Sequence, residues 1–254
     1  LRMELPPSGR DAMEASVRFW WLDGQLADSV ARIIRVPCWE EIAANYPVAT
    51  AAQLDALVDW RDGPPGGGRL LIWHGPSGSG KTHAVQMLAG AWRAWADFHV
   101  ISDPEQFLGS PGYLMAVAGR DEGDGEEAHR WRVAVLEDAG EHLARDRVSA
   151  QDPALARLLN LCDGLLGQAA RMLVLVTTNL SPRPLHPALR RPGRQLAEVA
   201  FEPFGREEIA QWCAARDVPP LERGEATLAE LYAHAEGRAP APATPVFGFA
   251  VSDR

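Results

Sequence analysis

Eight consecutive residues decide the fold: Gly75-Pro76-Ser77-Gly78-Ser79-Gly80-Lys81-Thr82. They match the pattern G-x-x-x-x-G-K-[ST], directly after the apolar run Leu70–Trp73 and at the start of an amphipathic stretch. The glycines let the backbone curl so that successive N–H groups point at phosphate oxygens, and the following helix adds the positive end of its dipole. The pattern predicts an ATP-binding loop, with Lys81 on the β- and γ-phosphates and the Thr82 hydroxyl on Mg²⁺. A glycine-rich turn without a ligand is the alternative.

From Arg69 onward, short apolar runs alternate with longer amphipathic stretches. This alternation predicts an α/β fold with a parallel sheet and helices on both faces. The expected strands are Leu70–Trp73, Phe98–Ile101, Val133–Leu136, Met172–Thr177 and Leu196–Phe201. The expected helices are Lys81–Trp95, Pro153–Leu166, Arg206–Ala215 and Leu228–Ala235, with Asp152 and Thr227 as N-caps of the second and fourth.

The glycine- and proline-rich stretch 63–68 predicts a boundary. We expect an N-terminal extension and linker over residues 1–68, a P-loop core over 69–204, and a short helical lid with a C-terminal tail over 205–254. Within the extension, helices are expected around Gln25–Ile34 and Ala51–Trp60. Because the numbering starts at Leu1 instead of Met, residues are expected to precede it.

Composition narrows the class of function. The 254 residues are 46% hydrophobic and carry a net charge of −9, which argues against a protein whose main role is to wrap nucleic acid. The three cysteines, Cys38, Cys162 and Cys213, are too widely spaced for a zinc site or a disulfide framework, so a reducing cytoplasm fits best. No apolar run approaches the ~18–20 residues that span a bilayer.

A second acidic site is needed to hold Mg²⁺ and to orient the attacking water. The apolar strand Val133–Leu136 ends in Glu137 and Asp138, whereas the common order is Asp-Glu. Register places Glu137 on the metal side and Asp138 in the position of the base, although the two can exchange roles. The alternatives are a strand that runs into an acidic helix N-terminus, or a site that binds without hydrolysing.

Three further segments follow the acidic pair in a fixed order. They are Leu158–Leu165 (LLNLCDGL), Leu173–Asn179 (LVLVTTN) and Leu185–Arg194 (LHPALRRPGR). Together with the phosphate loop they resemble the AAA family, within the AAA+ superfamily, over roughly residues 68–204. The resemblance implies an ATP-hydrolysing enzyme that assembles as a homo-oligomer, most often a hexameric ring.

The resemblance also implies roles for single residues. Asn179 corresponds to the sensor 1 residue beside the γ-phosphate, and Arg194 to the arginine finger that reaches the site of the neighbouring subunit. The implied catalytic set is Lys81, Glu137, Asp138, Asn179 and Arg194. A second family arginine is replaced by Ala197, so either Arg194 acts alone or Arg190 compensates, while Arg191 is expected to fix the subunit interface. A buried, satisfied Asn179 and a solvated basic loop are the alternatives.

Contacts with a substrate or the base are less specific in the sequence. Phe107-Leu108-Gly109, with Tyr113 behind it, lies where motor members of the family carry a pore loop, but core packing is an equal alternative. Tyr46 lies where the family linker often covers adenine, so stacking is weighed against packing. His74 and His83 are expected to be structural.

Three functions are consistent with these residues. The leading hypothesis is a ring that remodels an unidentified protein client. A DNA-acting loader is a second hypothesis, although no basic surface or helix-turn-helix is apparent. A nucleotide-switched scaffold with little turnover is a third.

Overall fold

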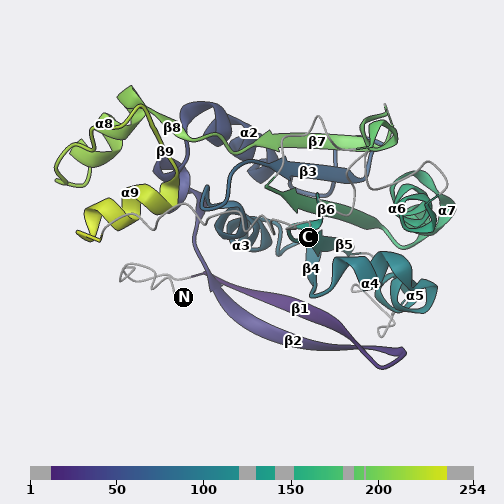
Figure 1. Cartoon of the computed structure of the whole chain (residues 1–254). Helices are drawn as coiled ribbons and strands as arrows, with labels where there is room; N and C mark the ends of the chain where they lie inside the picture. The colour runs from purple at the N-terminus through teal and green to yellow at the C-terminus, as the bar shows by residue number, and fades with distance from the viewer. Residues whose placement is uncertain (1–12, 120–129, 141–151, 180–185, 192, 239–254) are drawn as a thin grey trace, which may run out of the picture.

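The computed structural model describes residues 13–119, 130–140, 152–179, 186–191 and 193–238. A seven-stranded sheet in the order β2-β1-β4-β5-β6-β3-β7 forms its centre (Figure 1). Each neighbouring pair is parallel except β1 with β2, so the sheet is mostly parallel, as expected. The strands are β1 (Met13–Asp23), β2 (Leu26–Val36), β3 (Leu70–His74), β4 (Ala96–Ile101), β5 (Trp131–Leu136), β6 (Met172–Thr178) and β7 (Gln195–Ala200).

Alternating side chains of the strands feed two hydrophobic cores, one on each face of the sheet. Leu71 and Trp73 enter the core that α2 (Val48–Val58) and α3 (Lys81–Ala91) cover. The neighbouring residues Leu70 and Ile72 enter the opposite core. The helices of that second face are α4 (Pro104–Gly109), α5 (Pro111–Gly119), α6 (Pro153–Asp163) and α7 (Leu165–Ala169). Helices on both faces confirm the predicted α/β class.

A small C-terminal unit has its own hydrophobic cluster, built around Trp212 and Leu231. It comprises β8 (Phe204–Gly205), α8 (Arg206–Ala214), β9 (Glu225–Ala226) and α9 (Leu228–Ala235), at one end of the sheet in Figure 1. Thr227 caps α9 as predicted, because its side chain accepts a hydrogen bond from Glu230 N. Asp152 caps α6 in the same way.

The helix expected at Gln25–Ile34 is wrong. These residues belong to β2, which pairs antiparallel with β1 from Met13↔Val36 to Asp23↔Leu26. Gly24 has a φ of 61°, which suits a two-residue hairpin loop. β1 then joins the sheet beside β4, so the N-terminal hairpin extends the same sheet that carries the phosphate loop. The domain boundary at residue 68 stays a prediction.

Two predicted helices have different ends. α3 stops at Ala91, because Trp92 and Trp95 lie in a turn and donate their indole N–H groups to the carbonyls of Leu57 and Trp60. The single helix expected over Pro153–Leu166 is two helices, since Gly164 is extended. The other helix expected in the N-terminal part, Ala51–Trp60, is α2 (Val48–Val58). It follows a short connection made of α1 (Trp39–Ile42) and the 3₁₀ turn η1 (Ala43–Asn45).

Candidate nucleotide site

The phosphate loop follows β3, which lies between β6 and β7 in the sheet. Ligands of open parallel sheets bind at the carboxyl ends of strands, where the strand order reverses, and the loop lies at such a point. Gly75, Gly78 and Gly80 all have positive φ values, of 149°, 79° and 92°. A Cβ atom at Gly75 would lie 2.1 Å from the carbonyl oxygen of Phe201, so no other residue fits there.

Lys81 is the one lysine in the sequence, and it is 8% exposed. Its ammonium donates to the carbonyl oxygens of Gly75 (2.8 Å) and Pro76 (3.0 Å) and to Asn179 Oδ1 (2.9 Å). Burial lowers the pKa of Lys81, while the charges of Asp138 and Glu137 act in the opposite direction. The ammonium is thus held at the loop by oxygen acceptors that phosphate oxygens can replace.

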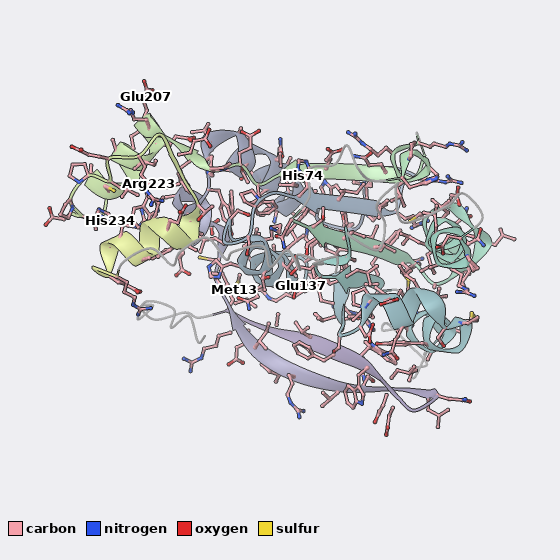
Figure 2. The ribbon with its side chains drawn as sticks, in the orientation of Figure 1. Met13, His74, Glu137, Glu207, Arg223 and His234 are labelled. Carbon is pink, nitrogen blue, oxygen red and sulfur yellow. The ribbon has the colours of Figure 1, made fainter. Side chains whose placement is uncertain are left out.

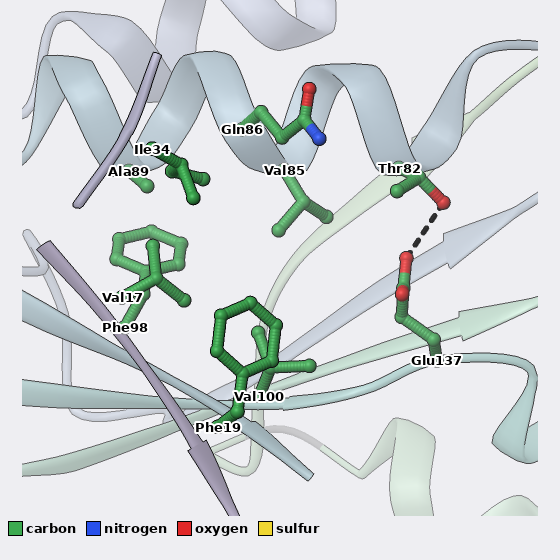
Figure 3. A pocket seen from close by; sticks show the side chains of 10 residues that line it. All are labelled: Val17, Phe19, Ile34, Thr82, Val85, Gln86, Ala89, Phe98, Val100 and Glu137. Carbon is green, nitrogen blue, oxygen red and sulfur yellow. Dashed lines mark hydrogen bonds between the residues drawn. The ribbon is translucent and has the colours of Figure 1, made fainter. Parts of the chain in front are cut away.

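The two acids occupy different positions. Glu137 Oε1 accepts a hydrogen bond of 2.7 Å from the Thr82 hydroxyl (Figure 3; Glu137 is also labelled in Figure 2). Asp138 Oδ1 accepts one of 3.0 Å from the Asn179 amide, and the Asp138 backbone N–H donates to Thr177 Oγ1. Glu137 is therefore next to the predicted metal-binding hydroxyl, and Asp138 is next to the predicted sensor.

The donor set beside Thr82 suits Mg²⁺. A hydroxyl oxygen and a carboxylate oxygen in contact are the hard ligands that this ion takes, with waters and phosphates completing its shell. The glycine cradle and the ammonium of Lys81 suit a polyphosphate. The residues present therefore fit Mg²⁺-ATP.

An apolar pocket of about 80 Å³ borders these residues (Figure 3). Thr82 and Glu137 lie at its polar side, and the rest is lined mainly by apolar side chains of β1, β2, α3 and β4. Its lining includes Val17, Phe19, Ile34, Val85, Phe98 and Val100. The pocket is too small and too apolar to hold a nucleotide, so we place the nucleotide on the loop.

Arg194 lies at the opposite edge of the sheet. Its backbone carbonyl accepts from the N–H groups of Arg69 and Leu70, at the start of β3, whereas the phosphate loop follows the end of that strand. At ~3.3 Å per residue, the five residues of β3 separate the two positions by roughly 15 Å. The Arg194 guanidinium donates to Asp163 Oδ2 and to the carbonyl of Ala188.

The neighbouring arginines differ from Arg194. Arg190 forms an ion pair of 3.1 Å with Glu198 of its own chain, and Arg191 is exposed. The structure thus brings together Lys81, Thr82, Glu137, Asp138 and Asn179 and leaves Arg194 on the far side of the sheet.

The chain matches a known protein family. Residues 71–203, more than half of the chain, match the family described as "ATPase family associated with various cellular activities (AAA)". The chain belongs to the AAA family. Its ATPase domain implies nucleotide binding and ATP-driven activity.

Two curated relatives are similar to this chain over a little more than half of its length. The chain is 30% identical over 146 residues to the ATPase family gene 2 protein of Saccharomyces cerevisiae, which covers 54% of this chain and 17% of that protein. It is 29% identical over 167 residues to Protein SAV of Sulfolobus acidocaldarius, with 58% and 19% covered. The chain thus spans less than a fifth of the length of these relatives.

Of the two alternatives for Phe107-Leu108-Gly109, the structure favours core packing over a pore loop. Asp103 caps α4 and Pro104 opens it, so that Phe107 and Leu108 turn inward and are buried. Tyr113 is also buried and meets the Phe107 ring edge-on at 5.4 Å. The alternative of core packing accounts for all three side chains.

Tyr46 does not offer a face for adenine. Its ring is 4% exposed, stacks on Trp39 and meets Phe201 edge-on, while its hydroxyl donates to the Gly80 carbonyl at 3.2 Å. The hypothesis that Tyr46 stacks on adenine is therefore wrong. Its hydroxyl instead holds the backbone of the phosphate loop at Gly80. No local pattern pointed to that contact, because it joins residues 34 positions apart.

Two histidines flank the phosphate loop. His74 lies 3.3 Å from Glu198, and His83 is buried; burial lowers the pKa of both. In the C-terminal unit, Arg223 pairs with Glu230 at 2.8 Å (Figure 2 labels Arg223).

In the part of the chain that the structure describes, no helix is long and apolar enough to cross a membrane.

Proposed function

We propose that this AAA domain hydrolyses Mg²⁺-ATP at the interface between two copies of the chain, and that a homo-oligomeric ring, hexameric by analogy with the family, uses the energy to remodel a protein partner. One observation carries the proposal. Arg194 and the phosphate loop lie at opposite edges of one sheet, about 15 Å apart, so Arg194 can complete only the site of another copy.

The side chains at the phosphate loop have separate roles in the reaction. Lys81 exchanges its carbonyl partners for phosphate oxygens and releases Asn179 Oδ1. Thr82 and Glu137 hold the ion, which when bound neutralises charge on the β- and γ-phosphates. Asp138 orients the attacking water and accepts its proton, and the Asn179 amide fixes Asp138 in place.

Arg194 supplies the positive charge that the transition state needs. For this role its guanidinium leaves Asp163 and contacts the phosphate of the neighbouring copy. Arginine fingers of this kind raise the rate by ~10³–10⁵-fold in other NTPases. The net charge of −9 favours a protein partner over DNA, and Phe107 is buried, so the partner is bound through other residues.

Mixing two inactive variants tests the shared site. One copy carries Arg194→Ala, and the other carries Glu137→Gln with Asp138→Asn. In an equal mixture, random pairing gives an intact interface in about a quarter of the contacts, so turnover returns. Each variant alone is the negative control, and Arg190→Ala, whose guanidinium pairs with Glu198, is the matched arginine control. No recovery at any ratio would show that the site is completed within one chain.

The client is tested separately. The Asp138→Asn form is expected to hold ATP without turnover and to retain its partner in a pull-down from cell extract. A partner retained with ATP and released with ADP supports remodelling. Retention of DNA in place of protein would favour the loader hypothesis.

A further inference from the structure

The C-terminal unit rests directly on the phosphate loop. The backbone N–H of Ala229, in the first turn of α9, donates to the carbonyl of Gly78 at 2.9 Å. A Cβ atom at Gly78 would lie 2.9 Å from Ala229 Cβ, and one at Gly80 would lie 3.0 Å from Leu228 Cδ2. Any tilt of α9 therefore changes the surroundings of the loop that receives the phosphates.

Asn45 joins this unit to the rest of the chain. It is 5% exposed, and its Oδ1 accepts from Arg216 Nη2 at 2.6 Å and from the Tyr232 hydroxyl at 3.1 Å. Both donors are held by Trp212, since the Arg216 guanidinium lies 4.2 Å above its ring and Tyr232 meets it edge-on at 5.3 Å. Two donors fixed on the core of the C-terminal unit thus converge on one buried acceptor.

The residues that follow Asn45 reach the loop and the unit as well. Tyr46 donates to the Gly80 carbonyl, so adjacent residues contact the C-terminal unit and the phosphate loop. The backbone N–H of Val48 donates to Glu208 Oε1 in α8 at 2.9 Å. Residues 45–48 therefore contact both the C-terminal unit and the phosphate loop. These two parts must keep a fixed relative position for the loop to keep its shape.

We infer that Asn45 is a positioning residue for ATP: it fixes the C-terminal unit so that the first turn of α9 lies on Gly78 and the loop is preorganised for phosphate. This inference rests on the proposed nucleotide site. Asn45 acts through Arg216 and Tyr232 and touches no reacting atom. Only its acceptor oxygen is required, because both partners donate to Oδ1.

The test separates ATP affinity from turnover. Asn45→Ala removes the acceptor of a charged donor and a hydroxyl, and we expect the Kd for ATP to rise about tenfold. Turnover at saturating ATP stays near the wild-type value, because Lys81, Asp138 and Asn179 are untouched. Asn45→Asp supplies carboxylate oxygens for the same donors, so it restores affinity to within about twofold.

Two further variants guard against a purely structural effect. Thr50→Val is the matched control: Thr50 is buried in the same part of the chain, but its hydroxyl donates to Ala200 of the sheet region and not to the C-terminal unit. It is expected to lower the melting temperature and leave the Kd for ATP unchanged. Tyr232→Phe removes one donor without a change of shape and weakens ATP binding in the same direction as Asn45→Ala. It serves as the test if Asn45→Ala does not fold.

The outcomes distinguish this inference from the proposed function. If the wild-type chain binds and hydrolyses ATP but folded Asn45→Ala, or Tyr232→Phe in its place, keeps the wild-type Kd, the positioning role is wrong and the nucleotide site stands. An Asn45→Asp variant as weak as Asn45→Ala would also overturn it. A wild-type chain that does not bind ATP would overturn both.

Discussion

The two edges of the sheet carry opposite kinds of chemistry. At the carboxyl edge, Lys81, Asn179 and Asp138 form a continuous chain of hydrogen bonds, with Thr82 and Glu137 beside it. At the amino edge, the Arg194 guanidinium pairs with Asp163 of its own chain. The carboxyl edge is arranged to bind an anion, whereas the amino edge carries a cation, Arg194, that is neutralised within its own chain.

This difference is the basis of the proposal that two copies share one site. Parallel strands place all their carboxyl ends at one edge and all their starts at the other. Arg194, which directly precedes β7 and lies beside the start of β3, is therefore too far from the loop after β3 for its side chain to reach that loop. In the proposed assembly, the amino edge of one copy faces the carboxyl edge of the next, which is a head-to-tail contact.

Removing one cation from each edge is expected to give the largest effects. Lys81→Ala is expected to abolish ATP binding, because the loop loses its charge. Arg194→Ala is expected to lower turnover by ~10³–10⁵-fold and leave the Kd for ATP unchanged, since the finger acts on the transition state in a neighbour. ATP titrations with steady-state turnover measure both, with Arg190→Ala as the control. Equal loss of ATP affinity in both variants would place Arg194 in the site of its own chain.

A second prediction distinguishes the roles of the two acids at the carboxyl edge, Asp138 and Glu137. Asp138→Asn removes a base and is expected to lower turnover by ~10²–10⁴-fold while ATP stays bound. Glu137→Gln weakens the contact at Thr82 and is expected to raise the Mg²⁺ concentration that gives half-maximal turnover. Turnover measured across a Mg²⁺ titration separates the two. If Asp138→Asn is the variant that needs more Mg²⁺, the two acids have exchanged roles.

The sequence predicted the carboxyl edge far better than its surroundings. The loop, the strand before Glu137 and the strand before Asn179 are each specified within a few residues, by glycine positions and apolar runs. The hairpin was missed because Leu26, Val30, Ile33 and Ile34 recur at helical spacing. Pairing with β1 overrode that pattern and put these residues in a strand.

The burial of aromatic side chains could not be predicted from the local sequence. The sequence locates Phe107 and Tyr46 near functional segments, but tertiary packing decides whether such rings are exposed or buried, and both are buried. Asn45 gave no local signal, because Arg216 is 171 residues away in the sequence. Such contacts depend on how distant elements pack, which no periodicity encodes.

The smallest predicted effect is a change in the pKa of Lys81, at the carboxyl edge. Because Lys81 is the one lysine in the sequence, ¹³C-labelled lysine gives one side-chain NMR signal. Burial holds the pKa of Lys81 below its usual 10.5, so in the free protein the signal titrates below that pH, and ATP binding weakens as rising pH neutralises the ammonium. Bound ATP raises the pKa, because phosphate charge favours the protonated form.

Two variants complete this measurement. Asp138→Asn removes an opposing charge and is expected to lower the pKa of Lys81 further. Arg194→Ala is expected to leave it unchanged in the free chain, since about 15 Å of sheet separates the two residues. A free-protein pKa at or above 10.5 would contradict the burial of Lys81. A shift caused by Arg194→Ala in an oligomer, but not in a dissociated chain, would show the two edges in contact.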